Sequence, residues 1–271
     1  MIRRLAFGLF LLAQVWPAHA DLGTSLVLGT LGNTMASNGT QEEGTPMSPT
    51  YRAQVHTELG AAYFARGQLG VAIQELNEAI ESDSSYAPAH NVLGLVYMQL
   101  KETDLARRHF ERAVSIAPKD SEAQNNYGWF LCQNGQPKEA IGHFMAALKN
   151  PLYATPEKPY LNAGICSLKQ HEEAAAEGYF HKALQLQPRL APALYFLAEI
   201  AYKRSDYGEG KRYIERYMQL VAEPSAENLW LAVRIARKGG DRNSEAQYGF
   251  MLRKRYPDSG EAQMLREGRY D

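Results

Sequence analysis

The chain has 271 residues, of which 45% are hydrophobic and 22% are charged, so most of it has the composition of a folded protein. Its formal net charge of −1 gives no basic excess, which argues against a nucleic-acid partner. The same balance argues against an acidic disordered tail.

The first twenty residues have the order of a secretory signal peptide. Arg3 and Arg4 precede an apolar run at 5–15, and small residues follow at Ala18 and Ala20. The run is too short for a membrane span, although an uncleaved anchor is the alternative interpretation. Cleavage after Ala20 would remove two arginines and lower the net charge from −1 to −3. No cysteine follows the run, so no lipobox is expected and the predicted location is the periplasm.

Residues 21–50 are predicted to be a flexible leader. The stretch 22–49 is rich in Gly, Ser, Thr, Asn and Pro, and only Glu42 and Glu43 are charged in it. A short apolar patch at 26–31 is the exception.

From Tyr51 onward the chain repeats with a period of about 34 residues. Small and aromatic residues recur in the same order, and Pro118 and Pro188 close two of the units. The recurring positions are Gly60, Gly94, Gly128 and Gly164; Ala72, Ala106, Ala140 and Ala176; Leu76, Phe110, Phe144 and Phe180; and Ala79, Ala113, Ala147 and Ala183. A period of this length with these residues is typical of the tetratricopeptide repeat (TPR), a pair of antiparallel helices.

The pattern therefore predicts an all-α TPR superhelical solenoid of about six helix-turn-helix repeats over 51–258. The first helix of each unit (helix A) carries a glycine where the second (helix B) approaches closely, and the aromatic residue of helix B fills the space. The expected units are 53–86, 87–120, 121–156, 157–190, 191–224 and 225–258, with a C-terminal tail at 259–271 that has room for one short helix.

Three units depart from the pattern. The third is two residues longer, in a turn that contains Pro151, Pro156 and Pro159. The fifth has Ala198 in place of the glycine. The sixth needs a two-residue insertion if Ala246 and Phe250 are to occupy the alanine and aromatic positions, and such drift is typical of capping repeats.

No pattern in the sequence indicates catalysis. Two pairs of histidines occupy equivalent positions in successive units, His56 with His90 and His109 with His143, and these follow from the repeat. Equivalent positions lie about a helix-packing distance apart, which is too far to share a metal. No metal-protease, phosphate-loop or serine-nucleophile motif is present. We therefore expect no enzyme activity, no cofactor, no metal and no small-molecule substrate.

Cys132 and Cys166 lie on the A helices of adjacent units. Adjacent A helices pack side by side, so the two side chains can come within disulfide reach. Export to an oxidising compartment favours a bridge, and two buried free thiols are the alternative.

The surface formed by the A helices is the expected partner-binding groove. By resemblance to the general repeat, its lining residues are Asn91, Leu95, Asn125, Trp129, Leu161, Ile165 and Tyr195. An aromatic residue in such a groove is a plausible hot spot. For Trp129, packing against the next A helix is an equally good interpretation.

Several longer stretches resemble the PilF/PilW family of type IV pilus biogenesis proteins. They are NNYGWFLCQNGQPKEAIGHF, NPLYATPEKPYLNAGICSLK, FHKALQLQP, AENLWLAVRIARKGGD and LRKRYPDS, and the resemblance spans about 51–261. Both cysteines fall in these stretches, which adds weight to a bridge.

The resemblance implies a non-catalytic periplasmic adaptor that supports assembly, localisation or stability of the outer-membrane secretin and of pilus fibres. Its partners would be the secretin and other type IV pilus proteins, and it would reach the membrane only through them. One departure is that lipoprotein members have a lipobox cysteine where this chain has WPAHAD. The alternative function is a periplasmic TPR scaffold for another envelope complex, one for cell-wall synthesis or polysaccharide export.

Overall fold

The computed structural model describes residues 48–270, which form thirteen α-helices and no strand. The predicted signal peptide and most of the leader lie outside the described residues. The chain divides into two compact units, with the boundary between Asn134 and Gly135. None of the helices in the described part of the chain is both long enough and apolar enough to cross a membrane.

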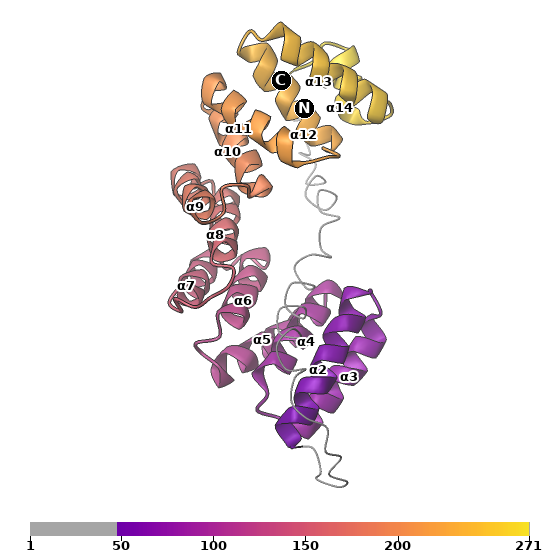
Figure 1. The fold of residues 1–271 in the computed structure, drawn as a ribbon, viewed down its shortest axis with the longest axis vertical. Coiled ribbons are helices and arrows are strands. Elements are labelled where there is room, and N and C mark those ends of the chain that lie inside the picture. The colour runs from indigo at the N-terminus through magenta and orange to yellow at the C-terminus, as the bar shows by residue number, and fades with distance from the viewer. Residues whose placement is uncertain (1–47, 271) are drawn as a thin grey trace, which may run out of the picture. The chain divides into compact units, whose positions relative to one another are not determined.

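The described part of the first unit contains five helices (Figure 1). They are α2 (Pro49–Ala65), α3 (Leu69–Ser82), α4 (Ala87–Gln99), α5 (Thr103–Ile116) and α6 (Ser121–Gln133). A and B helices alternate, so α2, α4 and α6 are A helices and α2 and α6 each contact α4. Helix α2 begins two residues before the expected start of the repeats, because Ser48 caps it by accepting a hydrogen bond from the Tyr51 amide.

The second unit contains eight helices. They are α7 (Pro137–Ala147), α8 (Glu157–Lys169), α9 (Glu173–Leu186), α10 (Ala191–Lys203), α11 (Tyr207–Leu220), α12 (Ala226–Lys238), α13 (Arg242–Arg255) and α14 (Gly260–Arg266). Helix α7 has 11 residues, three fewer than the B helices α9, α11 and α13. The additional length of the third repeat forms the connection to α8.

In the pairs α2–α3 and α4–α5, a glycine of helix A packs against a large residue of helix B. A Cβ atom added at Gly94 would lie 2.7 Å from Cδ1 of Phe110, and one added at Gly60 would lie 2.6 Å from Cγ of Leu76. Phe110 and Leu76 are fully buried. Glycine is therefore needed at these A-helix positions to let the two backbones approach, as the sequence pattern predicts.

The register predicted for the sixth repeat is wrong. Helix α13 begins 16 residues after the start of α12, the same spacing as between α4 and α5 and between α10 and α11, so the repeat has no internal insertion. Gly249, not Phe250, occupies the usual aromatic position, and Phe250 is 58% exposed.

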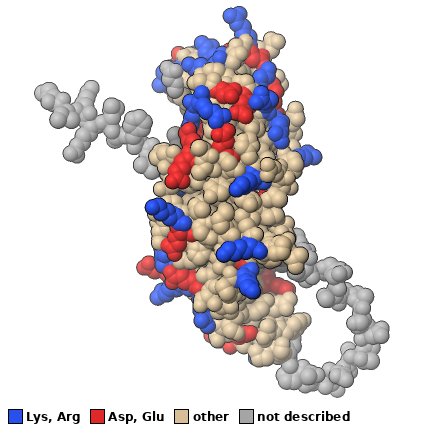
Figure 2. Space-filling view, turned by 90° about the vertical axis from the view of Figure 1, so that its left-hand side faces the viewer, with Lys and Arg blue, Asp and Glu red and all other residues tan. Residues whose placement is uncertain are grey.

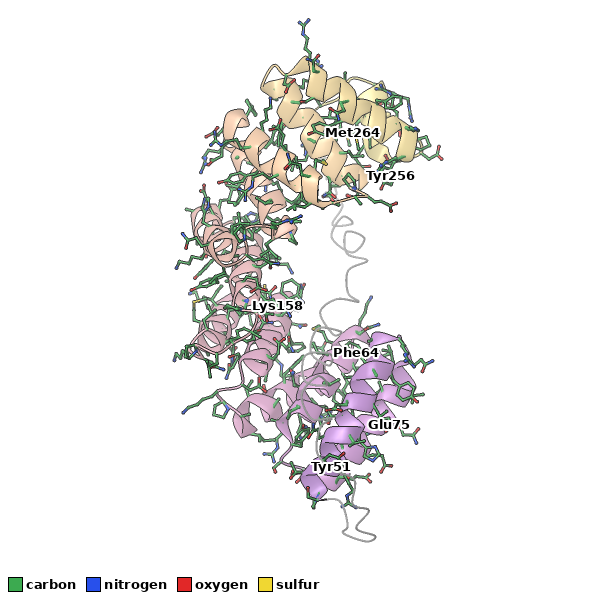
Figure 3. The ribbon with its side chains drawn as sticks, viewed as in Figure 1. Tyr51, Phe64, Glu75, Lys158, Tyr256 and Met264 are labelled. Atoms are coloured by element: carbon green, nitrogen blue, oxygen red, sulfur yellow. The ribbon has the colours of Figure 1, made fainter. Side chains whose placement is uncertain are left out.

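Helix α14 supplies the missing bulk at this position. Cδ2 of Leu265 lies 3.3 Å from where a Cβ of Gly249 would be. Leu265 and Met264 pack on a cluster that includes Trp230 and Leu252, and Figure 3 shows Met264 and Tyr256 among these C-terminal helices. The last helix pair is thus completed by α14 instead of by its own aromatic residue.

The turn from helix A to helix B has the same backbone conformation in every repeat. Two residues after each A helix, one residue has φ between +60° and +76°. These residues are Gly67, Lys101, Gly135, His171, Ser205 and Gly240. Glycine adopts this left-handed region without steric cost, whereas Lys101, His171 and Ser205 adopt it at a cost.

Candidate functional site

The A-helix surface of the first unit contains two of the predicted groove asparagines, and both are buried. Asn91 and Asn125 are each 3% exposed. Asn126 Nδ2 donates to Asn91 Oδ1 at 3.2 Å, and Asn125 Nδ2 donates to Asn126 Oδ1 at 3.4 Å. The three amides therefore join α4 to α6, and Asn91 and Asn125 present little surface to a partner.

Leu95 and Trp129 are the more accessible members in this unit. Both are half-buried, Leu95 on α4 and Trp129 on α6. Tyr127 and Phe130, the neighbours of Trp129, are buried and form a ring cluster with Phe110. Phe110, Tyr127 and Phe130 therefore form a packing side of this part of the unit.

In the second unit, Ile165 and Tyr195 are half-buried and pack on the hydrophobic core, while Leu161 is 8% exposed. The Tyr195 ring contacts Tyr217 with centroids 5.7 Å apart, which fixes its orientation. Leu161 is part of the core, so Ile165 and Tyr195 are the members that retain accessible surface.

A set of residues on α12 extends this surface, and the sequence analysis missed it. The Arg234 guanidinium lies 4.8 Å from the Tyr202 ring centroid and 5.8 Å from that of Trp230. The Nε of Arg234 is buried and has no hydrogen-bond partner among the described residues. We call Tyr195, Glu199, Tyr202, Glu227 and Arg234 the α10–α12 patch. The stretch AENLWLAVRIARKGGD, which resembles the PilF/PilW family, contains Glu227, Trp230 and Arg234.

Charges in the α10–α12 patch are only partly compensated. Burial raises the pKa of the Glu227 carboxyl, and the Glu199 and Glu261 carboxylates raise it further, while Arg234 and a hydrogen bond from Tyr195 oppose the rise. Burial, followed by the Glu227 charge, raises the pKa of Tyr195, so this phenol stays a hydrogen-bond donor at neutral pH. The patch therefore combines aromatic surface with carboxylate acceptors.

The histidines do not form a metal site in the described part of the chain. No group of three or more His, Cys, Asp or Glu side chains there is placed to hold a metal ion. His90 and His109 do meet, with their Nδ1 atoms 3.1 Å apart and their rings stacked at 5.4 Å. They lie on helices A and B of one repeat, so a comparison of equivalent positions in successive repeats could not find this contact.

Cys132 on α6 and Cys166 on α8 are both buried. They lie in different units, and their pairing stays a prediction.

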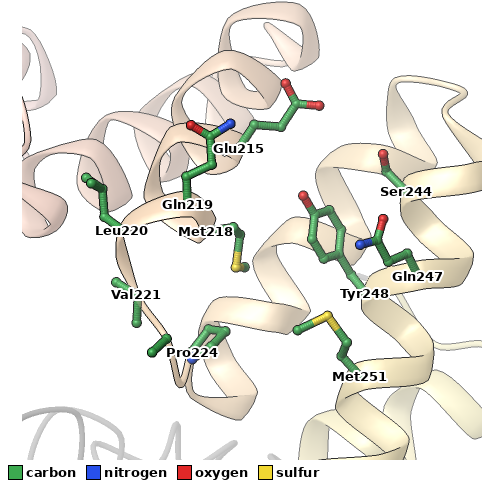
Figure 4. Close-up of a pocket in the computed structure, with 11 residues that line it drawn as sticks. Glu215, Met218, Gln219, Leu220, Val221, Pro224, Ser244, Gln247, Tyr248 and Met251 are labelled. Carbon is green, nitrogen blue, oxygen red and sulfur yellow. The ribbon is translucent and has the colours of Figure 1, made fainter.

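A pocket of about 590 Å³ lies between the B helices α11 and α13 (Figure 4). Met218 and Met251 line it with Tyr248, and Glu215 lies at its edge.

Family models of the repeat match the N-terminal half of the chain. A model described as TPR repeat matches residues 60–101, and two described as tetratricopeptide repeat match 87–120 and 109–142. Together with the helix pairs, these matches define a TPR repeat protein.

Similar proteins and solved structures show which family the chain belongs to. The type IV pilus assembly protein PilF of Pseudomonas aeruginosa is 31% identical over 208 residues, which cover 77% of this chain and 82% of that protein. The crystal structure of PilW, described as a widely conserved type IV pilus biogenesis factor, has 33% identity and a TM-score of 0.73 over 79% of this chain and 97% of that one. A structure of Pseudomonas aeruginosa PilF has 29% identity and a TM-score of 0.76 over 82% and 100%. The chain belongs to the PilF/PilW family of type IV pilus TPR proteins.

Proposed function

We propose that this chain is a non-catalytic periplasmic adaptor of type IV pilus biogenesis that supports assembly, localisation or stability of the outer-membrane secretin. The observation that carries the proposal is the similarity to PilF, which extends over 82% of that protein. Secretin binding and export to the periplasm are part of the proposal.

Binding takes place on the A-helix surfaces. The residues expected to matter most are those with accessible surface, namely Leu95, Trp129, Ile165 and Tyr195. Trp129 and Tyr195 are large and their rings lose few rotamers on binding, which is the usual character of a hot spot. In the second unit, the carboxylates and rings of the α10–α12 patch suit an extended partner segment with basic or amide side chains.

Deletion of the gene tests the proposed role in type IV pilus biogenesis. We expect loss of surface pili and of heat-stable secretin multimers, with both restored by the wild-type gene. Intact pili together with altered envelope composition would instead support a scaffold for another envelope complex and would overturn the proposal.

A pull-down from envelope extract tests whether the A-helix surfaces bind the secretin. We expect Trp129→Ala and Tyr195→Ala each to reduce secretin capture by about tenfold or more. The matched control is Tyr51→Ala, because Tyr51 is 52% exposed at the start of α2, away from the predicted groove positions. Undiminished capture by both groove variants would show that the A-helix surfaces do not carry the interaction.

A further inference from the structure

The outward face of α13 is basic, with one aromatic residue at its centre. Eight residues of this helix are exposed: Arg242, Asn243, Ala246, Gln247, Phe250, Arg253, Lys254 and Arg255. Four of them are basic and none is acidic. The one acidic residue of α13, Glu245, is turned away and pairs with Arg237 at 2.8 Å.

Phe250 lies in the middle of this face. At 100° per residue, Ala246 and Arg253 fall on one side of it and Lys254 on the other. The Lys254 ammonium lies 5.8 Å from the Phe250 ring centroid. The ring is 58% exposed, and the packing of the repeat does not account for its residue type, because Gly249 occupies the core position.

Local structure explains only part of the positive charge. Arg255 donates to the carbonyl of Ala222 at 3.3 Å, and basic residues in a last turn also complement the helix dipole. Arg242 is in the first turn, where the dipole disfavours it, and neither Arg242, Arg253 nor Lys254 forms an ion pair within residues 48–270. By contrast, the exposed face of α5 mixes both signs, with Asp104 and Glu111 beside Arg108 and Arg112.

We infer that the outward face of α13 docks on an anionic phospholipid surface, with Phe250 inserted at the headgroup level and Arg242, Arg253 and Lys254 against lipid phosphates. An aromatic side chain flanked by cations fits the membrane interface, where the ring is partly desolvated and the charges stay hydrated. A protein partner is less favoured, because the exposed face belongs to a single convex helix.

The basic surface continues toward the end of α12. Arg242 and Lys238 also line a pocket of about 610 Å³, in which Glu245 pairs with Arg237. Figure 2 shows Lys and Arg side chains projecting at the upper end of the view, where the C-terminal helices lie. This inference is independent of the proposed function, and it gives the chain a direct membrane contact in addition to contact through partners.

Vesicle co-sedimentation of the full chain tests the inference. Binding to phosphatidylcholine vesicles should rise when phosphatidylglycerol is included and should fall as salt is added. Each surface cation contributes about fivefold in affinity, so the double variant R253Q/K254Q should bind about 25-fold more weakly. Phe250→Ser should also weaken binding, by about tenfold.

The matched control is R108Q/R112Q, which makes the same charge change on the mixed face of α5 and should leave binding unchanged. All substituted side chains are exposed, so thermal unfolding should not shift for any variant, and unchanged unfolding shows that lost binding is local. The inference would be overturned if both double variants lost vesicle binding equally, or if R253Q/K254Q lost none. Binding of soluble polyglutamate as tight as binding of anionic vesicles would also overturn it and would indicate an acidic protein partner.

Discussion

A methyl group added at Gly94 has no room, because its position is 2.7 Å from Cδ1 of the buried Phe110 ring. We expect Gly94→Ala to lower the free energy of unfolding by about 1–3 kcal/mol, despite the higher helix propensity of alanine. Urea denaturation measures the change. Gly178→Ala on α9 is the control, because its Cβ would meet open space, and it should raise stability by about 0.5–1 kcal/mol. A destabilised Gly178→Ala or a neutral Gly94→Ala would contradict this account of the helix pair.

The contact between His90 and His109 predicts a loss of stability in acid. Burial, followed by the neighbouring His90 and Arg108, lowers the pKa of His109 to about 4, and burial also lowers that of His90. Between the ordinary value of 6.5 and about 4, the unfolded chain binds protons that the folded chain does not, so stability falls as pH falls through this window. We expect His109→Gln to remove about 1–2 kcal/mol of that dependence, a figure reduced for the partial exposure of the ring.

Unfolding at a series of pH values compares His109→Gln with the wild type. The control is His181→Gln, because His181 is exposed on α9. If the free energy of unfolding changed with pH by the same amount in the wild type and in His109→Gln, the histidine contact would make no contribution to the pH dependence.

At the scale of helices, the sixth pair shows how an element outside the repeat can replace one of its residues. Leu265→Ala in α14 should lower the free energy of unfolding by about 1–2 kcal/mol, since Leu265 fills the space above Gly249 and is itself half-buried. Chemical denaturation checks this, with Leu152→Ala as control because Leu152 is 88% exposed. If both variants had equal stability, α14 would have no part in completing the pair.

Most of the helix pairs could be predicted because the small and large residues that pack together recur at the same spacing in successive repeats. Gly94 and Phe110 recur at a fixed spacing, so their contact can be read from the sequence. The last pair could not be predicted in this way, because Gly249 occupies its large position and Leu265 of α14 fills the space instead. The connection of residues 221–225 between α11 and α12 also shifts the register by one residue, and periodicity alone cannot detect that shift.

The candidate site was predicted less well, for a different physical reason. Repeat position gives the direction of a side chain but not the hydrogen bonds it will form. Asn91 is at a predicted groove position but is buried, and Asn126 donates a hydrogen bond to it. Arg234 was missed because its importance lies in the rings of Tyr202 and Trp230 around it.

For the whole molecule, we propose that Cys132 and Cys166 form a disulfide that closes a loop of about 34 residues. A proteolytic map without reductant should contain one linked peptide pair. The double variant C132S/C166S should unfold with a free energy lower by about 2–4 kcal/mol, since a link of this length mainly restricts the unfolded chain. Two free thiols in the map would contradict the pairing.

The left-handed turns are sites where substitution by glycine can raise the free energy of unfolding. Three of the six repeats place Lys101, His171 or Ser205 where glycine fits without strain, and these sites are far enough apart in sequence to act independently. Replacing all three with glycine should relieve about 1 kcal/mol of backbone strain at each, less the entropy that glycine adds to the unfolded state. The net gain is then about 0–2 kcal/mol beside a total stability of about 5–15 kcal/mol, and the substitutions touch neither the A-helix surfaces nor the face of α13. Such a variant is a more tolerant background in which damaging substitutions can be studied while the protein stays folded.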